Sequence, residues 1–157
     1  MTRLGFVVTA ILGVASLTAL APVATQDAAG VTGAAEASFP SGATFNGLPL
    51  TGLTLGQGVI IALDGSATGQ FQAVLQGTSL LGTPQNITVE GEVSNGSVAV
   101  GGSATFSGTA TVDMGDGSVP LVGVPFTVTA STGSLGLILG ATALPTATLT
   151  AGSITVQ

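Results

Sequence analysis

Apolar and polar residues alternate with a period of two along most of the chain after residue 43. The clearest stretch is Ser103–Met114, which has a small or apolar residue at every second position and Ser, Thr or Asp between them. Successive side chains of a strand point to opposite faces, whereas a helix would mix these two sets. The same alternation in Gln70–Gln76, Asn86–Val93 and Phe126–Ser131 predicts further half-buried strands.

Turn-forming residues divide this pattern into short segments. Asp64-Gly65, Ser94–Ser97, Asp113–Gly117 and Ser131–Ser134 all combine Gly with Asp, Asn or Ser, and Asn95-Gly96 is the strongest hairpin signal among them. The apolar phase changes at Gly152, which predicts a bulge or turn there. We therefore expect about eight strands, near residues 43–55, 58–63, 68–77, 86–94, 97–113, 124–131, 134–140 and 145–157.

Short connections between consecutive strands favour antiparallel neighbours. The fold class that follows is all-β, an antiparallel meander of about eight strands. An up-and-down barrel is the first choice and a β-sandwich the second. A helix is expected only in the hydrophobic N-terminal leader.

The N-terminal region has the features of a targeting segment. Arg3 precedes a run of uncharged, mainly apolar residues from 4 to 24, so residues 1–24 are predicted to be a signal peptide, with a retained membrane anchor as the alternative. Membrane contact is expected only through residues 4–24 if the leader stays uncleaved. Residues 25–42 are small and weakly polar, which predicts a flexible spacer before a single β domain at 43–157. The protein is expected to be secreted, at the cell surface or outside the cell.

The charge balance excludes several partners. Seven acidic residues face one basic residue, Arg3, for a formal net charge of −6. Removal of the leader would leave no Lys or Arg, and nucleic-acid binding depends on these residues. We therefore expect no nucleic-acid partner.

The chemistry of standard active sites is also missing. The chain has no His and no Cys, so neither a Ser-His-Asp triad nor a zinc site of the usual ligands can form. Glu90 and Glu92 remain as a pair of carboxylates, about 7 Å apart on one strand face, and we interpret them as part of a solvated strand face that discourages edge association. We expect no catalytic residues and no cofactor.

Two further patterns have a functional and a structural explanation. Asp113 and Asp116 are weak calcium candidates, because Asp oxygens bind Ca²⁺, but Asp residues also stabilise turns. Thr-x-Thr at 109–111, 127–129 and 146–150 could order water as in ice-binding proteins, but Thr is also a favourable exposed strand residue.

Two functions remain open from the sequence. The first is a non-enzymatic structural or assembly protein of the cell surface or extracellular matrix, which self-associates through strand edges in the spacer or the C-terminal strand. The second is a barrel that binds a small hydrophobic ligand.

Overall fold

The structure is a computed structural model that describes residues 28–157. This part of the chain is all-β and contains ten strands in an antiparallel arrangement, with no helix. The strands are β1 (Ala29–Ser38), β2 (Thr44–Phe45), β3 (Leu48–Ile61), β4 (Ser66–Thr78), β5 (Pro84–Ala99), β6 (Ser103–Asp113), β7 (Leu121–Ala130), β8 (Ser134–Leu139), β9 (Thr142–Ala143) and β10 (Ala147–Val156).

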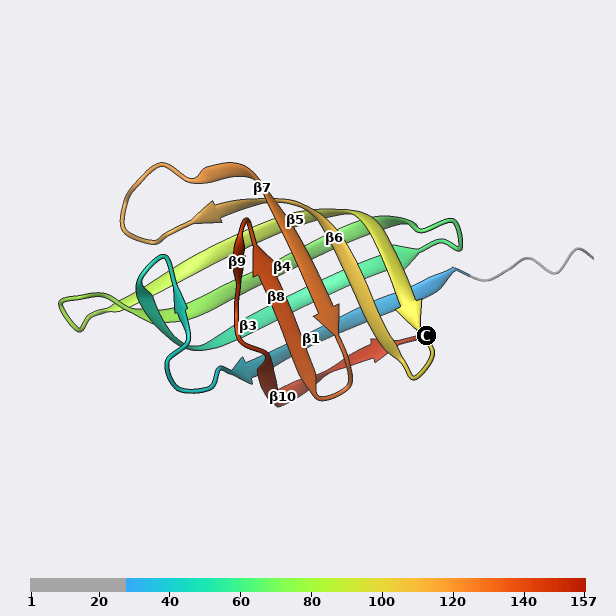
Figure 1. Cartoon of the computed structure of the whole chain (residues 1–157), viewed down its shortest axis with the longest axis horizontal. Helices are drawn as coiled ribbons and strands as arrows, with labels where there is room; N and C mark the ends of the chain where they lie inside the picture. Colours follow the sequence, from blue (N-terminus) through green and yellow to red (C-terminus); the bar gives the residue numbers. More distant parts are fainter. Residues whose placement is uncertain (1–27) are drawn as a thin grey trace, which may run out of the picture.

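The long strands form a continuous ring of hydrogen bonds (Figure 1). Each strand from β3 to β8 pairs with the next one along the chain, β8 pairs with β10, and β1 joins β10 to β3. The short strands β2 and β9 pair only with β3 and β8. Gly30 and Gln157 exchange backbone hydrogen bonds of 3.1 and 2.9 Å, so the two ends of the described chain lie side by side.

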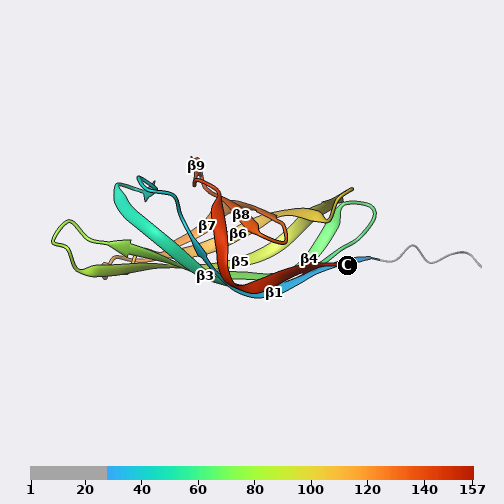
Figure 2. The ribbon, with the colours of Figure 1, turned by 90° about the horizontal axis from the view of Figure 1, so that it is seen from below.

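The ring is flattened rather than round. Figure 2 shows β1 and β3 in one layer, with β7 and β8 in the layer facing it. In Figure 1, β7 and β8 cross over β3 and β4 at a steep angle. Side chains on the inner faces of both layers therefore share one core.

The predicted alternation determines this core. Phe71, Phe106 and Phe126 occupy inward positions of β4, β6 and β7 and are almost completely buried. The ring of Phe71 stacks on that of Phe126 at a centroid distance of 5.6 Å, and lies 6.1 Å from that of Phe106 in a tilted geometry. The polar residues between them face outward, as expected from the period of two.

The prediction of a flexible spacer at residues 25–42 was wrong where the structure describes it. Residues 29–38 form β1, which pairs with β3 on one side and β10 on the other. Val31, Ala35 and Ala37 are buried, and Phe39 after the strand is buried too. The alternation was hidden because its inward residues are mostly small, so their hydrophobic signal is weak. Residues 25–27 and the predicted leader, 1–24, lie outside the described residues.

The predicted hairpin at Asn95-Gly96 was also wrong. Both residues lie inside β5, where Asn95 pairs with Ser107 and a bulge shifts the register. A Cβ at Gly96 would lie 2.8 Å from the side chain of Ile61, so this glycine permits close packing of an inward position. The turn follows at Val100–Gly102 instead, where Gly101 and Gly102 both have positive φ.

The other Asn-Gly pair makes the turn that the sequence reading overlooked. Asn46 and Gly47 have φ values of 49° and 81° and connect β2 to β3. Two positive φ values at the centre of a two-residue hairpin are those that Asn-Gly tolerates best. The predicted strand 43–55 is therefore interrupted here, and beyond the turn β3 continues without the expected break through residues 56–57.

Other predicted turns are confirmed. Asp64-Gly65 connects β3 to β4, and Ser131–Ser134 connects β7 to β8. The expected irregularity lies close to Gly152: the register between β10 and β1 shifts at Thr150, and Gly152 itself has a φ of 78°.

Candidate functional site

The calcium candidates Asp113 and Asp116 lie at and just after the end of β6. Asp113 Oδ1 accepts a hydrogen bond from the Gly115 backbone N–H at 2.8 Å, and Asp116 Oδ1 accepts one from the Ser118 N–H at 2.9 Å. Hydrogen bonding from Ser118 lowers the pKa of Asp116. Within residues 28–157 no group of three His, Cys, Asp or Glu side chains could hold a metal ion. These contacts explain both residues as turn formers.

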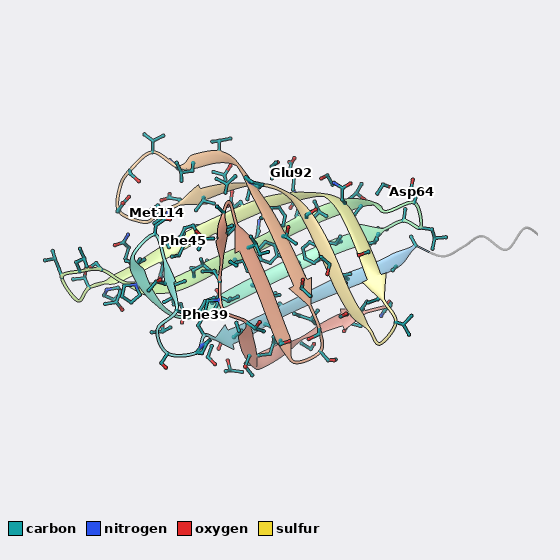
Figure 3. The ribbon with its side chains drawn as sticks, viewed as in Figure 1. Phe39, Phe45, Asp64, Glu92 and Met114 are labelled. Carbon is teal, nitrogen blue, oxygen red and sulfur yellow. The ribbon has the colours of Figure 1, made fainter. Side chains whose placement is uncertain are left out.

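Glu90 and Glu92 lie on the outer face of β5, both exposed. Their cross-strand neighbours are polar: Glu92 pairs with Gln70 of β4 and Thr109 of β6, and Figure 3 shows Glu92 on the outside of the ring. Glu90, two residues earlier on β5, lies in the same way between Gln72 of β4 and Thr111 of β6, so each glutamate is the centre of a cross-strand row of three polar residues. The two rows form the floor of a hollow of about 350 Å³, which we call the β4–β6 hollow.

A bulge in β7 forms a wall of the β4–β6 hollow. Ala110 pairs with Val124 and Val112 pairs with Leu121, so Thr111 faces two residues, Val122 and Gly123. Both line the hollow, and Val122 is 82% exposed. Bulges re-aim side chains and are frequent beside binding sites. The hollow thus combines a polar floor with one aliphatic side.

A second hollow lies on the outer face of β7 and β8. Its volume is about 440 Å³, and Thr127, Thr129 and Ile138 line it with the segment after β9. Thr129 Oγ1 lies 3.3 Å from Thr105 Oγ1 on β6. Thr127 and Thr129 of the Thr-x-Thr pattern therefore line a concave surface, whereas ice binding would need them on a flat one.

The interior contains one polar side chain that the sequence reading missed. Gln57 lies on β3, is 9% exposed, and its amide oxygen and nitrogen have no hydrogen-bond partner. Its register neighbours are Gly33 of β1 and Phe71 of β4. The signal was present in the sequence, because Gln57 falls in phase with the inward residues Leu53, Leu55, Val59 and Ile61.

Large apolar side chains are exposed at the turns. Leu80 and Leu81 in the β4–β5 turn are 96% and 91% exposed, and Val119 in the β6–β7 turn is 87% exposed. Both turns lie at the same end of the ring (Figure 1). The opposite end has the exposed residues Leu63 and Val100, beside a hollow of about 220 Å³ lined mainly by apolar residues such as Ala29, Ile61 and Val98.

Similarity to other proteins gives no further information. No protein-family model, curated protein or solved structure matches this chain. Residues 28–157 form no helix that is long and apolar enough to cross a membrane. Any functional conclusion therefore depends on the geometry described above.

Proposed function

We propose that the protein is a secreted, non-enzymatic structural protein of the cell surface or extracellular matrix that assembles with copies of itself. In this proposal the ring of strands is a closed up-and-down barrel that acts as a rigid body. The observation that carries the proposal is the nearly complete exposure of Leu80 and Leu81 at one end of the ring. Side chains of this size are normally buried, and their exposure together favours a contact surface.

The proposed contact uses turns instead of strand edges. The sequence offered the spacer, residues 25–42, and the C-terminal strand as free edges, and the two strands formed there, β1 and β10, pair with each other. β1 also pairs with β3 and therefore has no free backbone groups for strand addition, whereas residues 151–156 of β10 pair with β1 alone. The β4–β5 and β6–β7 turns provide an apolar alternative at one end, through Leu80, Leu81 and Val119.

The test is the molar mass of the purified full chain, measured by light scattering over a range of concentrations. We expect concentration-dependent association, and the double variant Leu80→Ser, Leu81→Ser should shift it toward the monomer. The matched control is Leu63→Ser, Val100→Ser at the opposite end, which should associate like the unmodified protein. A strict monomer at high concentration would overturn the proposal.

A second candidate function is the binding of a small, mainly hydrophobic ligand within the ring. Gln57 favours it, because a buried amide without a partner costs about 1–3 kcal/mol unless something completes its hydrogen bonds. A ligand with one hydrogen-bonding group would do so. Native mass spectrometry of the protein from its own host would show a co-purified small molecule, and a mass equal to that of the bare chain would remove this candidate.

A further inference from the structure

The second half of β10 has an open edge. β8 pairs with β10 only at Ala147 and Thr148, and it leaves β10 at a steep angle (Figure 1). Residues 151–156 therefore pair with β1 alone, and residues 150–153 are exposed in a row instead of alternating. On the side away from β1, this part of β10 has no strand to bond to within the described part of the chain.

The register with β1 shows which backbone groups point to the open edge. Gly30 and Gln157 exchange two backbone hydrogen bonds. In an antiparallel pair of strands, such hydrogen-bonded pairs alternate with pairs whose N–H and C=O groups point to the opposite side of each strand. Val156 and Ile154 belong to pairs of the second kind. The N–H and C=O groups of both residues therefore point to the open edge, where they offer donors and acceptors alike.

The sequence of this edge does not protect it from pairing with another strand. Natural edge strands are protected by charged side chains, by Pro or by bulges. β10 contains no charged residue and no Pro, and its bulge at Thr150 precedes the open residues 151–156. Ile154, Thr155 and Val156 are β-branched and favour the extended conformation that a paired strand requires.

A second copy of β10 is complementary to this edge. When two antiparallel strands are related by a two-fold axis, each donor of one copy meets the corresponding acceptor of the other. An axis near Thr155 would bring the free groups of Ile154 and Val156 of both copies together. Because β10 has no charged side chain, the contact places no like charges opposite each other.

We propose that residues 151–156 of β10 pair antiparallel with the same residues of a second copy of the chain. This inference rests on the proposed self-assembly and adds a second contact to the one through the turns at Leu80 and Leu81. Each contact joins like surfaces of two copies, so either one alone closes into a dimer. Together they link copies into an extended chain.

The experiment starts from the variant Leu80→Ser, Leu81→Ser, in which the turn contact is removed, and measures molar mass by light scattering at rising concentration. This variant should approach the mass of a dimer, whereas the unmodified chain should exceed it. Adding Val156→Pro removes one edge donor from each copy and should weaken the dimer roughly tenfold. Adding Thr155→Lys instead should weaken it about two- to fivefold, because two lysines then meet near the axis.

The matched control is Thr148→Lys in the same background. Thr148 is an exposed residue of the same strand, but it pairs with Ser38 of β1 and Ser134 of β8, so both of its edges are engaged. This variant should form the dimer as well as its parent does, and an equal loss would overturn the proposal.

The two contacts can fail separately. If the unmodified chain associates but the Leu80→Ser, Leu81→Ser variant is a strict monomer, the β10 contact is overturned and the turn contact stands. If that variant associates as strongly as the unmodified chain and Val156→Pro abolishes the association, the turn contact is overturned and the β10 contact stands.

Amide hydrogen exchange distinguishes strand pairing from any other contact in the dimer. The N–H groups of Ile154 and Val156 should exchange fast in dilute protein and slowly once the dimer forms. Those of Ser153 and Thr155, which face β1, should exchange slowly at both concentrations. Fast exchange of Ile154 and Val156 in the dimer would overturn the proposal.

Discussion

At the scale of single residues, Gln57 is the side chain that departs most from its surroundings. It occupies an inward position of β3 between small and aromatic register neighbours, and neither amide atom has a partner. Burial of an amide without hydrogen bonds opposes folding by about 1–3 kcal/mol. The residue therefore either destabilises the fold or contacts a molecule that completes its hydrogen bonds.

We predict that Gln57→Leu raises the free energy of unfolding by about 1–2 kcal/mol, because it removes the unpaired amide and keeps a similar volume. Urea unfolding followed by circular dichroism measures this change. The control Gln72→Leu, on the exposed face of β4, should give no comparable gain. A lower stability of the Gln57 variant would contradict this explanation.

A second residue-scale prediction concerns Asp64 in the β3–β4 turn, which Figure 3 shows at one end of the ring. Asp64 Oδ1 accepts hydrogen bonds from the Ser66 hydroxyl at 2.6 Å and the Ser66 N–H at 2.9 Å, and these lower its pKa below the ordinary value of 3.8. A lowered pKa means that the stabilisation is complete above about pH 4 and is lost as the pH falls through the folded-state pKa.

The melting temperature should therefore fall on acidification below pH 4, and this dependence should be smaller in Asp64→Asn, whose side chain does not titrate. Differential scanning calorimetry across the acidic range measures both curves. An NMR titration that gives a pKa for Asp64 at or above 3.8 would contradict the explanation.

The chemistry of single residues was largely predictable from the sequence, but their grouping was not. The outward direction of Glu90 and Glu92 followed from the period of two. The bulge that places Val122 beside them depends on how β7 pairs with β6, which no local pattern reveals. The inward direction of Gln57 could be predicted from the alternation along its strand. Its lack of hydrogen-bond partners could not, because it depends on which side chains surround it in the core.

At the scale of elements, the two Asn-Gly pairs show that the local sequence alone does not decide where a turn forms. Asn46-Gly47 forms a turn with positive φ at both residues, whereas Asn95-Gly96 lies within β5. Both pairs have the same local preference for a two-residue turn with positive φ. The difference is that β5 and β6 gain further pairing beyond residue 96, and that Gly96 provides room for the inward side chain of Ile61.

An element-scale prediction concerns Gly91, an inward residue of β5. A Cβ at this position would lie 2.6 Å from Cε1 and 2.8 Å from Cζ of Phe126, whose ring stacks on Phe71. Gly91→Ala should displace that ring and lower the free energy of unfolding by about 1–3 kcal/mol, the usual cost of overpacking a core. Thermal or urea unfolding measures the loss.

The matched control is Gly56→Ala on β3, where a Cβ would meet nothing within 4 Å. This variant should be as stable as the unmodified protein or slightly more so, because alanine restricts the unfolded chain. Combining Gly91→Ala with Phe126→Leu should lose less stability than the two single changes added together, since both act on the same space. Additive losses would disprove the proposed clash.

At the scale of the whole molecule, closure of the ring determines which surfaces remain for function. The closing strand β1 came from the segment that composition predicted to be a spacer, because small inward residues and polar outward residues resemble a linker. One of its pairing partners, β3, follows soon after it in the sequence, but the other, β10, lies at the far end of the chain. The all-β class and most strands were predictable, but this long-range pairing was not.

Closure also explains why assembly is proposed through turns. β1 is paired along both of its edges, and the thinnest connection of the ring is the one between β8 and β10, which covers only Ala147 and Thr148 on β10 and leaves residues 151–156 paired with β1 alone. The remaining accessible features are the exposed turns and the β4–β6 hollow.

Amide hydrogen exchange of the full chain, followed residue by residue, tests ring closure most directly. If β1 closes the ring, the amides of β1 that bond to β3 and β10 should exchange as slowly as those in the central pair β4 and β5. Fast exchange throughout residues 29–38, with slow exchange in β4 and β5, would show that this segment is a linker and that the ring is open.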